Sequence, residues 1–216
     1  MSKNVAVVLS GCGFKDGSEI HEAVLTLLAL DQQGAVYSCF APDIEQSKVH
    51  DHYRNTDTDE KRNVLTESAR IARGDIKPLA EFYATDFDAV IFPGGFGAAL
   101  NLCSFAQDGA DCIVNKDVEK TLVEMNRQGK AIGALCISPV LIAKVIENTT
   151  ITIGKEPNVA AAITSMGSIH EITDHGQVVV DTDNKIVTTP CYMLDSSLAQ
   201  VFAGVEKLVS ELLNMA

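Results

Sequence analysis

The sequence predicts an α/β fold with a mostly parallel sheet and helices on both of its faces. Short apolar segments alternate with amphipathic helical segments along most of the chain, which is the order found in parallel sheets. The short segments are apolar at nearly every position, as strands are when both faces of their sheet are covered. With 216 residues, 46% of them hydrophobic, the chain can bury a sizeable core, and we expect residues 1–216 to form a single domain.

Seven segments have the short apolar pattern of buried strands. In chain order they are residues 5–9, 36–40, 87–92, 131–135, 151–153, 178–180 and 186–188. Turn-forming residues end the first three: a glycine loop follows the first, Pro42 the second, and Pro93-Gly94-Gly95 the third. Residues 181–185 join the last two segments, so we expect a hairpin there.

Helical segments lie between these strands. The first is expected to be capped by Asp16 or Ser18 and to end at Gly34. The others span residues 63–73 and 116–127, begin at Ser138-Pro139, and span residues 194–213.

One stretch follows neither pattern. Residues 43–60 are polar and rich in Asp and His, and their apolar residues have no clear period. We therefore expect an irregular, solvated segment, with His50 and His52 in water.

Charge and composition exclude several classes of partner. Seventeen basic residues against 29 acidic ones give a net charge of −12, the wrong sign for nucleic acid or an anionic membrane surface. No run reaches the roughly 18–20 apolar residues of a membrane span, and the apolar start is too short for a signal peptide. The six cysteines lack CxxC or zinc-finger spacing, so we expect reduced thiols, no metal and a cytoplasmic protein.

Candidate functional residues gather where predicted strands end. Residues 11–13, residues 94–97 and Cys136 each follow a different strand. Ligands of open α/β sheets sit at the carboxyl ends of the strands, so we expect these three segments to border one site.

Cys136 lies between a predicted strand and the helix that starts at Ser138-Pro139. A sharp strand-to-helix turn there is a nucleophile elbow, which lifts the sulfur to a helix N-terminus, where the thiolate is favoured and the pKa of the cysteine falls. The alternative is a buried structural cysteine. The other five cysteines are expected to be structural, although Cys12 at a strand end could line the same pocket.

A reactive thiol needs an acid/base partner and an oxyanion site. Glu19 and Glu22 share one face of the first helix, and a carboxyl buried beside a thiolate would have a raised pKa and could exchange protons with it. The alternative is that both acids stabilise the helix N-terminus, which suits Glu19 better, since Glu22 has apolar neighbours. Gly94 and Gly95 let backbone N–H groups approach an oxyanion, or simply form a tight turn.

Cofactor motifs are weak. Residues 11–17 have the spacing GxGxxxG instead of the dinucleotide fingerprint GxGxxG, and no acidic residue stands clearly at the end of the second strand. His21, Glu22 and Cys136 have no recognised metal-ligand spacing. We expect no bound cofactor and no metal.

Four segments together carry a resemblance to a known family. They are residues 8–13 (VLSGCG), 16–22 (DGSEIHE), 92–99 (FPGGFGAA) and 186–190 (IVTTP). In this order they closely resemble the ElbB branch of the ThiJ/PfpI superfamily, which has the class I glutamine amidotransferase-like fold. The resemblance covers essentially the whole chain. It implies a flavodoxin-like three-layer sandwich, a homodimer, and an elbow cysteine that faces a glutamate on a helix.

The resemblance also implies residue roles. Cys136 matches the elbow cysteine, and Glu22, twelve residues before Gly34, matches the family's glutamate better than Glu19 does. Gly94, Gly95 and the backbone amide of Ile137 match the oxyanion-binding positions. Proteins of this branch are associated with a glutathione-independent glyoxalase activity and, by name, with isoprenoid production.

Two departures from related enzymes argue against a protease-type or glutaminase-type triad. Protease-type relatives carry a histidine directly after the cysteine, and this chain has Ile137 there. Glutamine amidotransferases use a downstream His-x-Glu, whereas this chain has His170-Glu171 without an intervening residue. A cysteine–glutamate dyad remains.

Three functional hypotheses follow. In the first, the Cys136 thiolate attacks glyoxal or a similar small dicarbonyl, Glu22 moves the protons, and a hydroxy acid is released. In the second, the chain is a non-enzymatic dimer linked to isoprenoid biosynthesis that binds a partner or senses oxidation at Cys136. The third is a nucleotide-binding protein that uses residues 11–17.

Overall fold

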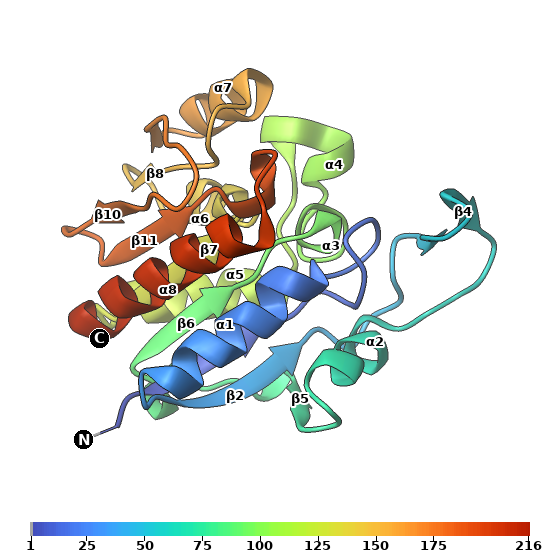
Figure 1. Ribbon diagram of the computed structural model, residues 1–216, viewed down its shortest axis with the longest axis horizontal. Coiled ribbons are helices and arrows are strands. Elements are labelled where there is room, and N and C mark those ends of the chain that lie inside the picture. The colour runs from blue at the N-terminus through green and yellow to red at the C-terminus, as the bar shows by residue number, and fades with distance from the viewer. Residues whose placement is uncertain (1) are drawn as a thin grey trace.

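The computed structural model describes residues 2–216, which form a seven-stranded sheet with helices on both sides (Figure 1). The strand order is β10-β11-β7-β6-β1-β2-β5, and every neighbouring pair is parallel except β10 and β11. Their bounds are β1 Asn4–Val8, β2 Val36–Ala41, β5 Ile76–Pro78, β6 Ala89–Phe92, β7 Ala131–Leu135, β10 Val179–Asp181 and β11 Ile186–Thr189. The order reverses between β1 and β6, which makes the carboxyl ends of these strands the expected ligand site. The predicted α/β fold and the hairpin between β10 and β11 are confirmed.

The helices divide into two layers. Their bounds are α1 Ile20–Gln32, α2 Val64–Ile71, α3 Phe96–Leu100, α4 Phe105–Asp108, α5 Lys116–Arg127, α6 Pro139–Val145, α7 Pro157–Ser165 and α8 Leu198–Met215. Apolar side chains of α1, α2 and α8 form one core with one face of the sheet, and those of α5, α6 and α7 form a second core with the other. Figure 1 shows α1 and α8 side by side on the same face.

Helix α1 begins later than predicted. Its N-cap is Glu19, whose side chain accepts a hydrogen bond from the backbone N–H of Glu22 at 2.8 Å. Asp16 and Ser18, the predicted caps, are buried before the helix and accept from other backbone N–H groups: the Ser18 hydroxyl from Ser10 at 2.9 Å, and the Asp16 carboxylate from His50 at 2.8 Å. Both side chains thus give a partner to a backbone N–H group that is turned away from water.

The stretch predicted to be irregular contains a small hairpin. Strands β3 (Val49–Asp51) and β4 (Thr56–Thr58) pair antiparallel there, and this excursion projects from the body of the molecule in Figure 1. The expectation that His50 lies in water is wrong, since its side chain is 8% exposed and its Nδ1 contacts the Asp57 carboxylate at 2.6 Å.

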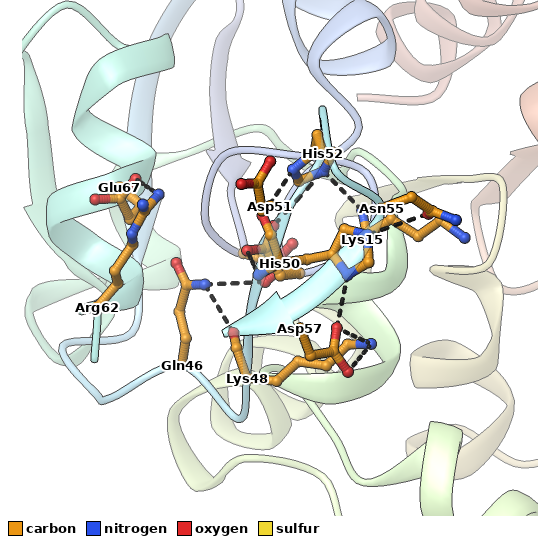
Figure 2. A network of polar contacts seen from close by, with 12 residues as sticks. Lys15, Gln46, Lys48, His50, Asp51, His52, Asn55, Asp57, Arg62 and Glu67 are labelled. Atoms are coloured by element: carbon orange, nitrogen blue, oxygen red, sulfur yellow. Dashed lines mark hydrogen bonds and ion pairs between the residues drawn. The ribbon is translucent and has the colours of Figure 1, made fainter. Parts of the chain in front are cut away.

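The hairpin is tied to the glycine loop of residues 11–17. Asp16 is buried, and its Oδ2 accepts from the backbone N–H of His50 at 2.8 Å. The backbone N–H of Lys15 donates to His52 Nε2 at 3.3 Å, and Figure 2 shows His52 facing this part of the loop. The side-chain amide of Asn101 also donates to the carbonyl of Asp16, at 2.9 Å. These contacts hold the glycine loop of residues 11–17 in place at the edge of the sheet where the candidate site lies.

Several elements had no sequence signal that we recognised. They are β5, α3, α4, α7 and β9 (Ile169–His170), whereas the strand predicted at residues 151–153 appears as β8 (Thr150–Ile151), which pairs with β9 outside the main sheet. Most of them are of eight residues or fewer, too short for a periodic pattern to stand out. Within residues 2–216, no helix has both the length and the apolar character to cross a bilayer.

The two-layer core predicts a clear contrast between two leucines of α8. Leu208 is fully buried and Leu198 is 51% exposed. We expect Leu208→Ala to lower the free energy of unfolding by about 2–5 kcal/mol, because it leaves a cavity between α8 and the sheet. Leu198→Ala is the matched control, with an expected change under about 0.5 kcal/mol. Urea unfolding followed by circular dichroism measures both, and equal losses would contradict the packing described.

Candidate active site

Four chain segments meet at the carboxyl edge of the sheet. Glu22 is in the first turns of α1, Gly94 follows β6, Cys136 follows β7, and Tyr192 follows β11. The strands β6, β7 and β11 are neighbours, so the residues that follow them emerge side by side. The segments that we expected to border one site, residues 11–13, residues 94–97 and Cys136, all lie at this edge.

Cys136 occupies a sharp turn between β7 and α6. Its φ of 58° is in the left-handed region, unusual for a residue with a side chain. The turn is held from both sides: the backbone N–H of Cys136 donates to the carbonyl of Thr189 at 2.9 Å, and the Ser138 hydroxyl donates to the carbonyl of Pro93 at 2.8 Å. A strained residue that its surroundings fix in this way is typical of functional turns.

The Glu22 carboxyl is fully buried beside Cys136. Its Oε2 accepts from the backbone N–H of Gly94 at 3.0 Å, and its Oε1 accepts from the backbone N–H of Tyr192 at 3.2 Å. The carboxyl also forms a hydrogen bond with the Cys136 side chain. The two side chains that the sequence predicted as a dyad are therefore in direct contact.

Only a glycine fits between them at position 94. A Cβ there would lie 2.3 Å from the Cβ of Cys136 and 2.5 Å from Oε2 of Glu22. The absence of a side chain at Gly94 thus sets how closely the carboxyl approaches the thiol.

Three backbone N–H groups were expected to bind an oxyanion, and one of them has another partner in the structure. Those of Gly95 and Ile137 form hydrogen bonds with the Cys136 sulfur. The N–H of Gly94 is occupied by Glu22. Gly94 therefore holds the carboxyl, and the oxyanion-binding role of Gly95 and Ile137 stays a prediction.

Burial raises the pKa of Glu22 to about 8. The negative charge of Glu19 acts in the same direction, while the hydrogen bonds from Tyr192, Cys136 and Gly94 act against it. The predicted upward direction is confirmed, and its main cause is the loss of water around the carboxylate.

The expectation of a lowered pKa at Cys136 is wrong. Burial raises the pKa of this thiol well above its ordinary value, and the charge of Glu22 raises it further. The amides of Gly95 and Ile137 lower it but do not outweigh these effects, because the residue is only 7% exposed. Burial therefore acts in the same direction on both groups, favouring the protonated form of the thiol and of the carboxyl.

Glu19 has mainly a structural role. It caps α1, as the alternative interpretation held, and its partly buried side chain borders the cavity in front of Cys136. Cys12 does not line that cavity; its nearest charged groups include Glu67 and Arg70 of α2.

A cavity of about 480 Å³ opens in front of Cys136. Its lining residues are Phe14, Glu19, Gly95, Phe96, Ala99, Phe105, Ala106, Cys136, Ile137, Glu156, Val159, Tyr192 and Met193. Sequence reasoning missed the apolar wall. Phe14 lies within the glycine loop of residues 11–17, and Phe96 lies within that of residues 94–97. Their place in these two loops was the signal that could have identified them.

The lining contains no histidine among the described residues. Ile137 occupies the position next to the cysteine, and His170 lies in β9, where its Nε2 accepts from the backbone N–H of Ile153 at 3.3 Å. Residues 2–216 contain no group of three or more His, Cys, Asp or Glu side chains suited to hold a metal ion. The acid/base group in contact with the thiol is Glu22.

Comparison with known proteins places the chain in a family. No family model matches the chain. It is 47% identical over 221 residues to the human "glutamine amidotransferase-like class 1 domain-containing protein 3, mitochondrial", covering 98% of this chain and 82% of that protein. The crystal structure of an "isoprenoid biosynthesis protein with amidotransferase-like domain" from Ehrlichia chaffeensis is 38% identical, with a TM-score of 0.93 over 99% of both chains. Drosophila melanogaster DJ-1beta shares the fold alone, at 18% identity and a TM-score of 0.57 over 100% of this chain and 96% of that one.

The same comparison corrects the expected location. The human relative is named mitochondrial, and so is a zebrafish ES1 protein that is 36% identical over 98% of this chain and 86% of its own. These names contradict the cytoplasmic assignment. That assignment rested on reduced thiols, which separate oxidising from reducing compartments but do not distinguish among the reducing ones.

The contact between Glu22 and Cys136 predicts a measurable change in the thiol. In Glu22→Gln the negative charge that raises the pKa of Cys136 is lost, so the thiol should ionise at a lower pH. The rate of iodoacetamide labelling at Cys136, followed by peptide mass mapping across pH, measures this. Glu147→Gln, at an exposed position, controls for the loss of one charge. An unchanged or higher midpoint in Glu22→Gln would refute the contact.

Proposed function

Because the chain belongs to the glutamine amidotransferase-like family, we propose that it is a glutathione-independent glyoxalase-type enzyme. It converts glyoxal, or a similar small dicarbonyl, to a hydroxy acid. The family gives the fold, and the observation that carries the reaction is local: the Cys136 sulfur touches the Glu22 carboxyl and two backbone N–H groups at once. A thiol, a carboxyl and backbone N–H donors close together are the groups that such a reaction needs as nucleophile, proton carrier and oxyanion donors, which supports the proposal.

The first step forms a hemithioacetal. The ionised Glu22 carboxylate takes the thiol proton while the sulfur attacks an aldehyde carbon. The new oxyanion is held by the N–H groups of Gly95 and Ile137, and it then receives the proton from Glu22. The raised pKa of Glu22, about 8, suits this exchange, since an acid/base group works best with a pKa near the working pH.

The second step moves a proton between the two carbons. Glu22, ionised again, removes the proton from the sulfur-bearing carbon, which gives an enediol. The proton returns to the neighbouring carbon, which leaves a hydroxy thioester on Cys136. Water hydrolyses the thioester, releases glycolate and restores the thiol. One carbonyl carbon is oxidised and the other reduced, so the overall reaction is glyoxal plus water giving glycolate.

The rival is a redox-sensing or partner-binding dimer linked to isoprenoid biosynthesis. The name of the Ehrlichia protein favours it. The raised pKa of Cys136 weighs against ready oxidation, because peroxide reacts with thiolates. Mild peroxide followed by intact-mass and peptide analysis tests it. Two oxygens added at Cys136 alone, without glycolate formation, would favour the sensor.

Glycolate formation by the purified protein with glyoxal alone tests the proposal. We expect many turnovers, a fall in rate of about 10²–10⁴-fold in Glu22→Gln, and at least as large a fall in Cys136→Ser. Glycolate is detected directly, because glyoxal also reacts with surface lysines and arginines. Cys12→Ser, outside the cavity lining, is the matched cysteine control. Undiminished glycolate formation in Cys136→Ser would eliminate the mechanism.

The pH dependence gives a separate test. A carboxyl with a raised pKa acts as a base only above that pKa, so kcat/KM should rise with pH and level off above about 8. Initial rates of glycolate formation between about pH 5.5 and 9.5 measure the profile. A flat profile, or a midpoint near the ordinary value of 4.5 for a glutamate, would show that Glu22 is not the base.

A further inference from the structure

The cavity in front of Cys136 is far larger than glyoxal. Its volume of about 480 Å³ lies within the range of about 300–1,000 Å³ found for pockets that hold drug-sized ligands. Glyoxal has only two carbons and two oxygens, so it would contact the sulfur and leave most of the cavity to water.

The walls of the cavity are mainly apolar. Three phenylalanine rings line it: Phe14 from the glycine loop, Phe96 from α3 and Phe105 from α4, and Val159 of α7 joins them. Phe14 is 45% and Phe96 is 53% exposed. Exposed rings beside a reactive group favour an apolar molecule that would cover them, because burying apolar surface is favourable.

The charges of the lining limit what that molecule can carry. Its two carboxylates are Glu19 and Glu156, and no lysine or arginine belongs to it among the described residues. The nearest cation to the rings is Lys15, whose Nζ lies 5.3 Å from the centroid of Phe14 and 5.9 Å from that of Phe96. At these distances the ammonium interacts with the ring faces. An anionic substrate would meet two carboxylates on the lining itself.

We propose that the cavity is a subsite for an apolar body, and that the preferred substrate is an uncharged 2-oxoaldehyde bearing an aromatic or branched aliphatic group. The proposal rests on the proposed function, because it uses the same thiol. The aldehyde carbon lies at Cys136, and the apolar group lies against Phe96, Phe105 and Val159. The reaction is unchanged: the oxoaldehyde gains one water and leaves as the matching hydroxy acid, so phenylglyoxal gives mandelate.

A substrate series tests the subsite. Glyoxal, phenylglyoxal and 4-carboxyphenylglyoxal are compared by direct detection of their hydroxy acids, with Cys136→Ser as the blank. We expect kcat/KM for phenylglyoxal to exceed that for glyoxal by about tenfold or more, the scale of a few buried carbons in an apolar pocket. The carboxylated analogue should lose most of this gain to repulsion by Glu19 and Glu156.

A substitution in the apolar wall tests whether this wall causes the preference for phenylglyoxal over glyoxal. Phe96→Ala should lower the ratio of kcat/KM for phenylglyoxal to that for glyoxal by about tenfold, whereas Tyr53→Ala, a 95% exposed aromatic elsewhere, should leave the ratio unchanged. Glyoxal turnover without a phenylglyoxal preference would overturn the subsite and leave the proposed function standing. If no hydroxy acid forms from any of the three, both proposals fail.

Discussion

The burial of the Glu22 carboxyl against the Cys136 sulfur is the constraint around which this edge of the sheet is built. A carboxyl without water is stable only if its oxygens find partners, and the chain supplies backbone N–H groups from two separate loops, at Gly94 and Tyr192. Even so, the loss of water raises its pKa to about 8. The group therefore sits near the boundary between acid and base at physiological pH, which is what proton transfer to and from a thiol requires.

Close backbone packing makes that burial possible. An added Cβ at Gly94 would collide with both members of the dyad, and one at Gly95 would come within 2.3 Å of the backbone nitrogen of Glu19. The loop before α1 and the loop after β6 are thus pressed together, and the Asp16 contacts with His50 and Asn101 hold the first of them from the far side. The packed backbone of these loops therefore holds Cys136 and Glu22 in place, and their relative position does not depend on flexible side chains alone.

The sequence predicted what is set locally. Apolar strands followed by glycines placed residues 11–13, residues 94–97 and Cys136 at one edge, and the apolar neighbours of Glu22 indicated that it points inward. Two things depended on the assembled fold. The N–H of Gly94 serves Glu22 instead of a substrate oxyanion, because α1 reaches the turn after β6. The pKa of Cys136 rises because burial outweighs the favourable amides.

The apolar wall of the cavity also could not be predicted from the local sequence. It is assembled from the loop before α1 and from α3, α4 and α7, which lie apart in the sequence, and α3 and α4 span only five and four residues. Such short helices show no period to detect. This wall, with its exposed phenylalanine rings, is the basis of the proposed subsite for a substrate larger than glyoxal.

An infrared titration of the Glu22 carboxyl tests the central claim most directly. The difference spectrum between the protein and Glu22→Gln isolates the band of this one group across pH. We expect a protonated carboxyl band that is present at neutral pH and disappears with a midpoint of about 8. A carboxylate already ionised at neutral pH, with a midpoint near 4.5, would contradict the shared burial of Glu22 and Cys136 on which the mechanism depends.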